Sequence, residues 1–342
     1  MPLSGFKVES PSVVGSEQPC SLDRSIWSWV NAYKVSFSIF ALNELGVLNL
    51  VANGALTSGQ IASQLDVNEE MLTPLLELLA SVGVLQKEDC GFRAQRGIET
   101  ILPLLAMESR LSASHVTASR IAQVVRTGEA ADIFQSANVE EYIPVFTAAM
   151  RSSARTLAPH LLRFGNIRQC RRVLDLGGAD GSLALALRRV APHLSITVVD
   201  LPRMQAAFEK QVNEQGASAA IDFCSADLRH PETLPGIIGS AEVVIISNVV
   251  HLLTTEQRLA LYRTVRQSMS PGARFLIYDQ FIDQDGPFNA THFMVVDWVI
   301  NGVQFRETPG QLCDVLRDLG YSAAEFRRFP GLPGAVIVAQ SS

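Results

Sequence analysis

The sequence predicts an α/β protein with a doubly wound parallel sheet in its C-terminal half and a smaller helical domain before it. Three observations support this prediction. The chain has 342 residues, which is longer than one ordinary compact domain. From Arg171 onward, short apolar strands alternate with helical segments. From Ser25 to Ser109 the pattern is helical, apart from one short hairpin. We therefore expect a flexible arm at 1–20, a helical domain at 21–110, a helical linker that contributes to a ligand pocket at 111–165, and the sheet domain at 166–342.

The composition excludes several classes of protein. With 47% hydrophobic and 18% charged residues, the chain can bury sizeable cores, so a mainly disordered or fibrous protein is excluded. A net charge of -6 gives no general attraction to nucleic acid or to anionic membranes. No apolar run approaches the roughly 20 residues that span a bilayer. The five cysteines form no CxxC pair, which favours a reducing cytoplasm over a disulfide framework or a zinc site.

The helical domain shows the order of elements that is typical of a winged helix. Thr57 and Gln60 have the spacing of a capping box, which predicts a short helix through Leu65. Asn68 is expected to cap a longer helix that ends at Gly83. Two short strands, Val84–Leu85 and Gly91–Arg93, then predict a wing. The residues expected on the apolar face of the longer helix are Met71, Leu75, Leu78, Leu79 and Val82.

A winged helix raises the possibility of DNA binding, but the charges argue against it. The segment from Ile61 to Leu85 contains no Lys or Arg, and Glu69, Glu70 and Glu77 lie on the helix that would enter the groove. Neutralisation of phosphates supplies most of the affinity for DNA, so this helix would be repelled. We expect a partner subunit instead, bound through the apolar helix that carries Trp27, Trp29, Phe37 and Phe40.

Polar residues gather where the predicted strands end. They are Asp175, Asp200, Asp227, the segment from Ser247 to His251, and Asp279. In doubly wound sheets, ligands bind beyond the carboxyl ends of the strands. These residues therefore predict a binding site at one edge of the sheet.

A glycine-rich turn follows the first strand of the sheet domain. Gly177, Gly178 and Gly181 do not fit the GxGxxG spacing of dinucleotide sites. They fit an acidic-x-Gly-x-x-x-Gly turn, in which small residues let the backbone approach a ligand without phosphate. Asp200 ends the second strand, where a carboxylate accepts hydrogen bonds from both ribose hydroxyls. The pattern predicts a nucleoside site.

The segment from Val173 to Pro202, VLDLGGADGSLALALRRVAPHLSITVVDLP, resembles the first two motifs of S-adenosylmethionine-dependent O-methyltransferases of the plant caffeate and bacterial polyketide type. The resemblance covers nearly the whole chain. It implies a Rossmann-like class I methyltransferase sheet, preceded by a winged helix that forms a homodimer and completes the partner's substrate pocket. It also implies that S-adenosylmethionine is the cofactor. The residues expected to hold its methionine, ribose and adenine parts are Asp175, Gly177, Gly178, Asp200, Leu201, Asp227, Leu228 and Ser247.

The resemblance also implies a catalytic base. Transfer of a methyl group to a hydroxyl requires removal of the hydroxyl proton, and a neutral histidine suits this task near pH 7. His251 occupies the place of the family's base, and Asp279 matches an acidic residue that orients it. His115, His160, His193 and His230 have no motif around them and are expected at the surface or in packing. The residues expected to line the acceptor pocket are Phe146, Met150, His292, Met294, Trp298 and Asn301.

The sequence departs from the family pattern at four places. Ala179 stands where relatives usually carry Gly. Leu252 and Leu253 replace the Asp and Trp that usually follow the base, and Ser247 stands where Lys or Arg is common. The order Arg306–Glu307–Thr308 reverses the usual Glu-Arg-Thr, so the second acidic partner of the base is lost or displaced by one residue.

We expect an O-methyltransferase that acts on a hydrophobic, aromatic or polyketide-like secondary metabolite in a bacterium or a fungus. The departures leave an alternative, in which the protein binds the cofactor but catalyses a cyclisation, rearrangement or hydroxylation without methyl transfer. A metal-assisted reaction through His251 and His292 is weaker, because Leu252 replaces the carboxylate that would complete a metal site. A DNA-binding regulator is disfavoured by the charges.

Overall fold

The computed structural model describes residues 20–130, 133, 139–217, 219–281, 290–302, 305, 307–330 and 332–341. The expected flexible arm lies outside these residues, apart from Cys20. The chain divides into two compact units, Met1–Ala113 and Ser114–Ser342. Each unit has its own hydrophobic core.

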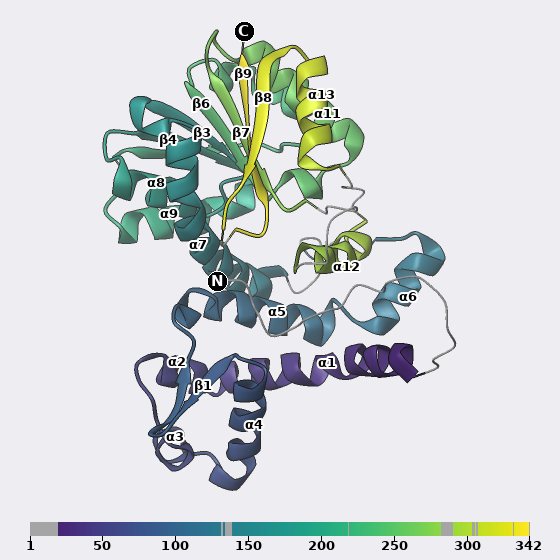
Figure 1. Cartoon of the computed structure of the whole chain (residues 1–342). Helices are drawn as coiled ribbons and strands as arrows, with labels where there is room; N and C mark the ends of the chain where they lie inside the picture. The colour runs from purple at the N-terminus through teal and green to yellow at the C-terminus, as the bar shows by residue number, and fades with distance from the viewer. Residues whose placement is uncertain are drawn as a thin grey trace. The chain divides into compact units, whose positions relative to one another are not determined.

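The N-terminal unit is mainly helical (Figure 1). Thr57 caps its third helix through the predicted capping box, and the Asn68 side chain accepts a hydrogen bond from the N–H of Met71 at the start of the fourth. The two short strands form an antiparallel hairpin, as predicted. The elements are α1 (Cys20–Glu44), α2 (Val47–Ala52), α3 (Ser58–Leu65), α4 (Glu69–Ser81), β1 (Leu85–Glu88), β2 (Gly91–Ala94) and α5 (Leu102–Ser114).

The buried face of α4 differs from the predicted one. The structure buries Leu72, Leu76 and Leu79, whereas Met71 is 64% exposed. Leucines surround most of this helix, so their spacing alone does not select one face. Packing against α1, α3 and β1 selects it instead.

The C-terminal unit contains a seven-stranded sheet with the order β5-β4-β3-β6-β7-β9-β8. The five strands from β5 to β7 are parallel, and the order reverses direction between β3 and β6. A crevice at such a reversal is the usual place for a ligand. The strands are β3 (Arg172–Leu176), β4 (Ser195–Asp200), β5 (Ile221–Ser225), β6 (Val243–Ser247), β7 (Arg274–Asp279), β8 (Tyr321–Arg328) and β9 (Ala335–Ser341).

The predicted sheet is parallel except at one edge. Strand β9 pairs antiparallel with β7, and β8, which the sequence did not reveal, pairs antiparallel with β9. Most residues of β8 are exposed because it is an edge strand. It therefore lacks the continuous apolar run by which the buried strands were recognised.

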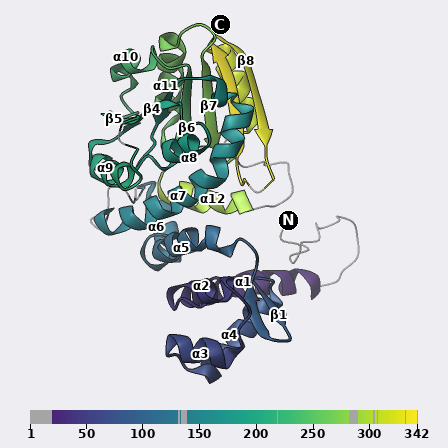
Figure 2. The ribbon, with the colours of Figure 1, turned by 90° about the vertical axis from the view of Figure 1, so that its left-hand side faces the viewer.

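Helices cover both faces of the sheet (Figures 1 and 2). One face packs against α7 (Val139–Phe164), α8 (Ser182–Val190) and α9 (Gln205–Glu214). The other packs against α10 (Pro235–Ile238), α11 (Thr255–Ser268) and α13 (Pro309–Asp318). Two further helices of this unit, α6 (Ala118–Thr127) and α12 (Met294–Ile300), contact each other. Among the described residues, no helix has both the length and the apolar character needed to cross a membrane.

Candidate functional site

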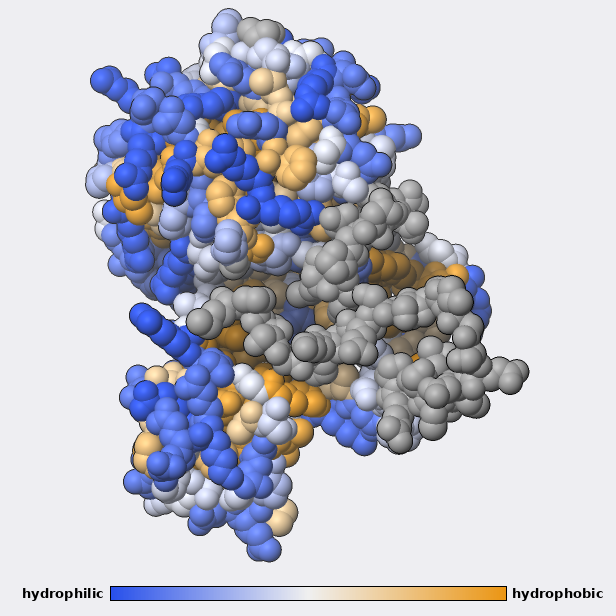
Figure 3. All heavy atoms as spheres, in the orientation of Figure 1, coloured by the Kyte–Doolittle hydropathy of each residue, from blue (hydrophilic) through white to orange (hydrophobic). Residues whose placement is uncertain are grey.

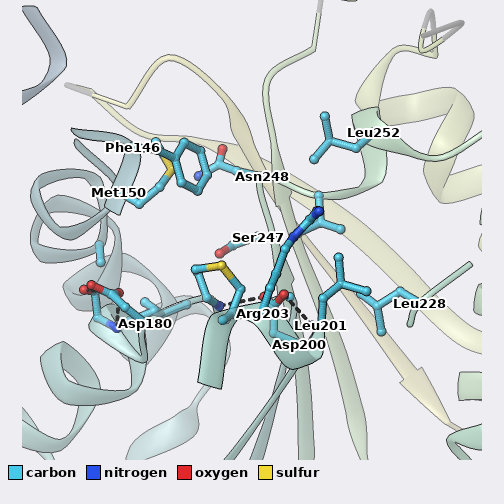
Figure 4. A pocket seen from close by; sticks show the side chains of 18 of the residues that line it. Phe146, Met150, Asp180, Asp200, Leu201, Arg203, Leu228, Ser247, Asn248 and Leu252 are labelled. Atoms are coloured by element: carbon cyan, nitrogen blue, oxygen red, sulfur yellow. Dashed lines mark hydrogen bonds between the residues drawn. The ribbon is translucent and has the colours of Figure 1, made fainter. Parts of the chain in front are cut away.

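A cavity of about 230 Å³ lies at the carboxyl ends of the parallel strands. Its walls include residues that follow β3, β4, β5 and β6, together with part of α7. Figure 4 shows Phe146 and Met150 on one side of the cavity and Leu201 and Leu228 on the other. Most of the predicted cofactor residues thus meet in one place. Those that line the cavity are Gly177, Gly178, Asp200, Leu201, Asp227, Leu228 and Ser247.

The glycine-rich turn brings the backbone close to this cavity. A Cβ atom on Gly178 would lie 2.5 Å from Oδ2 of Asp175, so only glycine fits there without a shift of the chain. Ala179 has φ 49°, in the left-handed region that disfavours residues with a side chain. Its N–H donates to Oδ2 of Asp200 at 2.8 Å. The turn is therefore fixed by the second strand as well as by the first.

Asp175 lies beneath this turn and does not line the cavity. It is fully buried, and neither carboxylate oxygen has a hydrogen-bond partner among the described residues. Burial, with a smaller contribution from the Asp200 carboxylate, raises the pKa of Asp175 to about 7. A buried carboxylate without a partner is costly, so this residue is poised to accept a cationic or hydrogen-bond-donating group.

Asp200 and Asp227 end neighbouring strands and have different surroundings. Asp200 accepts hydrogen bonds from the N–H groups of Ala179 and Leu201, and burial raises its pKa. Asp227 accepts from the guanidinium of Arg229 at 2.6 to 3.0 Å, and that interaction lowers its pKa. The cavity wall therefore carries carboxylates at the strand ends, beside the guanidinium groups of Arg203 and Arg229.

His251 and Asp279 are held together beside the cavity. The Nδ1 atom of His251 lies 2.7 Å from Oδ1 of Asp279, and the N–H of His251 donates to Oδ2 of Asp279 at 3.3 Å. Asp279 is fully buried, while the His251 side chain is 15% exposed. Asn248, Val249, Leu252 and Leu253, on both sides of His251, line the cavity. With the hydrogen on Nδ1 directed at the carboxylate, Nε2 retains a lone pair that can accept a proton.

The residues predicted to line the acceptor pocket divide into two groups. Phe146, Met150 and Asn301 line the cavity. His292, Met294 and Trp298 do not. Trp298 is 4% exposed, and its ring packs edge-on against Phe305 with the ring centroids 5.6 Å apart, as part of the core.

Of the two charged residues in the reversed motif before α13, the structure describes Glu307. Glu307 binds Arg258 of α11, with Oε1 2.7 Å from Nη2, while its Oε2 is buried without a hydrogen-bond partner among the described residues. Arg306 lies outside the described residues. A different carboxylate, Asp297 of α12, interacts electrostatically with His251, and burial raises the pKa of Asp297 to about 6.

Sequence analysis missed several residues near the cavity. Asp180 lines it and accepts a hydrogen bond from Arg151 of α7 at 3.2 Å. His115, expected at the surface or in packing, is buried, and its Nε2 lies 3.3 Å from Oδ1 of Asn301. The position of Asp180 in the glycine-rich turn was a usable signal. Arg258 and His115 carried none, because their partners are distant in the sequence.

The fold and the cavity define a class of protein, an α/β enzyme that binds a nucleoside at the switch point of its sheet. Residues 126–308 match the model of the O-methyltransferase domain, and residues 27–101 match the O-methyltransferase dimerisation domain. The first match covers more than half of the 342 residues. The chain therefore belongs to the O-methyltransferase family. The resemblance to S-adenosylmethionine-dependent O-methyltransferases is confirmed, together with the class I fold.

Curated relatives and solved structures agree with this assignment. The chain is 26% identical over 306 residues to the tetracenomycin polyketide synthesis 8-O-methyl transferase of Streptomyces glaucescens, covering 85% of this chain and 89% of the relative. It is 25% identical over 320 residues to the 3-hydroxy-5-methyl-1-naphthoate 3-O-methyltransferase of Streptomyces sahachiroi, covering 87% and 90%. The fold is similar to that of human N-acetylserotonin methyltransferase in complex with S-adenosylmethionine. The TM-score is 0.77 at 21% identity, covering 96% of this chain and 100% of that one.

The residues around the cavity fit S-adenosylmethionine. The turn at Gly178 has no room for a side chain, and an unpartnered buried carboxylate, Asp175, lies below it. The cofactor carries a cationic ammonium group and a cationic sulfonium, which match a cavity edge supplied with carboxylates. These matches, and the family assignment, do not favour the alternative without methyl transfer.

Proposed function

We propose that this protein transfers a methyl group from S-adenosylmethionine to a hydroxyl of a largely apolar small molecule, an aromatic or polyketide-like secondary metabolite. The observation that supports this most is the His251–Asp279 pair, at 2.7 Å, in a loop whose neighbouring residues line the nucleoside cavity. The two curated relatives are named for polyketide and naphthoate O-methylation. The apolar side chains of Phe146, Met150 and Leu252 in the cavity wall suit an acceptor of that kind.

The cofactor is held by the strand ends in this proposal. The glycine-rich turn takes the methionine part, with the Asp175 carboxylate buried beneath the turn. Asp200 and Leu201 take the ribose, and Asp227 and Leu228 the adenine. Asp200 keeps lone pairs for ribose hydroxyls while it accepts two backbone N–H groups. Arg229 keeps Asp227 ionised, so this carboxylate is a pure acceptor for an exocyclic amine.

His251 is the general base of the reaction. When bound, S-adenosylmethionine supplies an electrophilic methyl group on its sulfonium. Asp279 fixes the imidazole through Nδ1, so that Nε2 takes the proton of the acceptor hydroxyl as the oxygen becomes nucleophilic. The imidazolium that forms is stabilised by the buried Asp279 carboxylate. Apolar side chains around the cavity limit the access of water to the reacting oxygen.

The N-terminal unit forms a homodimer in this proposal. Its fold is inferred to be a winged helix, in which α3, α4 and the β1–β2 hairpin are the defining elements. Hydrophobic side chains are visible on this unit over the region of α1 (Figure 3). Burial of such a face by a second copy would remove its apolar area from water. Exposed apolar residues of α1 are Ile26, Trp27, Trp29, Val30, Tyr33 and Phe37.

A cytoplasmic location is proposed from the cysteines. Four of them, Cys90, Cys170, Cys224 and Cys313, are free thiols. Free thiols persist in a reducing compartment.

The proposal is tested by incubating the protein with labelled S-adenosylmethionine and a library of phenols and hydroxylated polyketides. We expect formation of S-adenosylhomocysteine and of a methylated acceptor. The substitution His251→Ala should lower the rate by about 100-fold or more, with the affinity for S-adenosylhomocysteine retained. An unchanged rate would remove His251 from the role of base. Conversion of an acceptor without S-adenosylhomocysteine would instead support a reaction that does not transfer methyl.

A further inference from the structure

A buried arginine lies behind the loop that carries His251. Arg258, in the second turn of α11, is 2% exposed. Its guanidinium donates to the carbonyl of Leu253 at 2.6 Å, to Oε1 of Glu307 at 2.7 Å and to Oγ1 of Thr255 at 3.2 Å. It also lies 5.1 Å from the centre of the Phe305 ring. A buried guanidinium with this many partners fixes each of them in place.

The carbonyl that Arg258 holds belongs to the base loop. His251 is in a short 3-10 turn, η6 (Val250–Leu252), and Leu253 follows directly. On its other side, this turn is held by Asp279, which binds both the ring and the N–H of His251. The loop is therefore clamped at two points, by a carboxylate at His251 and by a guanidinium two residues later.

The groups that surround Arg258 form a buried ionic cluster. The hydroxyl of Tyr262, one turn further along α11, has no hydrogen-bond partner among the described residues. Burial raises the pKa of Tyr262 well above its usual value, and the hydroxyl interacts electrostatically with Arg258, Asp279 and Glu307. The Tyr262 hydroxyl thus interacts with Arg258, with the partner of the base and with the glutamate of the reversed motif.

We propose that Arg258 is a positioning residue for the general base, and that Glu307 is its counter-ion. This inference depends on the proposed role of His251. Arg258 acts on His251 through the Leu253 carbonyl and does not touch the substrate. Glu307 supplies, through Oε1, the negative charge that a buried guanidinium needs.

The inference explains the reversed order of the motif. An arginine at position 307, as in the usual Glu-Arg-Thr order, would face the guanidinium of Arg258. Two buried like charges at this distance repel strongly, and removal of one partner of a buried pair leaves the other uncompensated. The glutamate at position 307 and the arginine at position 258 therefore depend on each other, in a pairing 49 residues apart.

The test uses variants of the full-length protein. The variants are Arg258→Met, Arg258→Lys and Glu307→Arg. The matched control is Arg263→Met, a change at an exposed position of the same helix. Binding of S-adenosylhomocysteine by calorimetry first shows which variants keep the cofactor site. Turnover with the acceptor, and the hydrogen exchange of the Nδ1–H proton of His251 by NMR, then report on the base.

For Arg258→Met we expect kcat to fall by about 10- to 100-fold, because a small displacement of a catalytic group has effects of this size. The affinity for S-adenosylhomocysteine should stay within about threefold, because the hydrogen bonds of Arg258 to Leu253, Thr255 and Glu307 involve none of the carboxylates in the cavity wall. The Nδ1–H proton should exchange faster as the loop loosens. Arg258→Lys should recover part of kcat, and the control should resemble the wild type.

Glu307→Arg should be the most damaging single change, because it places a second cation beside the buried guanidinium of Arg258. A normal kcat and a normal Nδ1–H signal in Arg258→Met would overturn the inference. So would a Glu307→Arg variant with both readouts unchanged. If the wild type forms no S-adenosylhomocysteine from any acceptor, the proposed function fails. The exchange of the Nδ1–H proton of His251 can still be measured in the free protein, and it decides whether Arg258 positions His251. The carboxylates that face His251 are Asp279 of β7 and Asp297 of α12.

Discussion

The cofactor side of the cavity and the base side are built from contacts of different range. On the cofactor side, Asp200 accepts from the N–H of the next residue, and Asp227 is held by Arg229, two residues away. On the base side, His251 pairs with Asp279 across 28 residues, and Arg258 pairs with Glu307 across 49. The cofactor side thus combines local contacts with one between strands, from the N–H of Ala179 to Asp200 across 21 residues, whereas the base side is assembled from separate elements.

This difference indicates where variation is tolerated. Contacts within a short segment keep their geometry when the rest of the domain changes. For the charge pair at positions 258 and 307, we expect a change at one position to require a change at the other. Three of the four departures from the family pattern lie in β6, in the loop after it and in the segment before α13. They are Ser247, Leu252 with Leu253, and Glu307. The fourth, Ala179, lies in the glycine-rich turn.

Among changes on the cofactor side, we expect Asp200→Ala to weaken cofactor binding most. The change removes the proposed acceptor of the ribose hydroxyls and releases the N–H of Ala179. Loss of charged hydrogen bonds of this kind costs about 1.5 to 3 kcal/mol, so we expect an affinity for S-adenosylhomocysteine about 10- to 100-fold weaker. Calorimetric titration measures it. Asp222→Ala, an exposed aspartate on β5, is the control, and equal effects of the two changes would contradict the role of Asp200.

A second prediction concerns Asp175, whose pKa of about 7 in the folded protein lies above its usual value near 3.8. As the pH rises, the unfolded chain loses the Asp175 proton at a lower pH than the folded protein does. The contribution of Asp175 to the free energy of unfolding therefore falls as the pH rises from about 4 to 7. Asp175→Asn removes this dependence. The difference in unfolding free energy between the variant and the wild type should therefore rise by about 1.4 kcal/mol, in favour of the variant, from pH 6 to pH 8.

Urea unfolding at the two pH values, without cofactor, measures this gain. Asp222→Asn is the matched control, because it makes the same change at an exposed position. If the variant and the wild type showed the same pH dependence, the buried carboxylate would not be the group that titrates.

The smallest expected effect is at Ala179, which has φ 49°. A left-handed conformation costs a residue with a Cβ about 1 kcal/mol more than glycine, so Ala179→Gly should stabilise the protein by about that amount. Ala186→Gly, inside α8, should have the opposite sign, because glycine weakens a helix interior by about 1 kcal/mol. Denaturant unfolding compares the two. A loss of stability in both variants would show that Ala179 is not strained.

The sequence predicted the cofactor side more fully than the base side. The glycine-rich turn and the carboxylates at the strand ends were identified from spacing and alternation, because both patterns are local. His251 and Asp279 were identified through the family resemblance, and the structure brings them together. The partner of Glu307 was not predicted, since no periodicity connects α11 with the segment before α13. Trp298 and Met294 were expected in the pocket but lie outside the cavity wall, because apolar residues on a short helix fit a core equally well.

The sequence alone determined the division into two domains, the parallel strands and the aspartates at the carboxyl ends of these strands. These features follow from hydrophobic periodicity and from turns, which act over a few residues. Only the tertiary structure decided which face of α4 is buried and that an antiparallel hairpin lies at one edge of the sheet. It also decided that the buried Arg258 pairs with Glu307. These features depend on desolvation and on pairing between distant segments, because the energy of a buried charge is set by its neighbours in space.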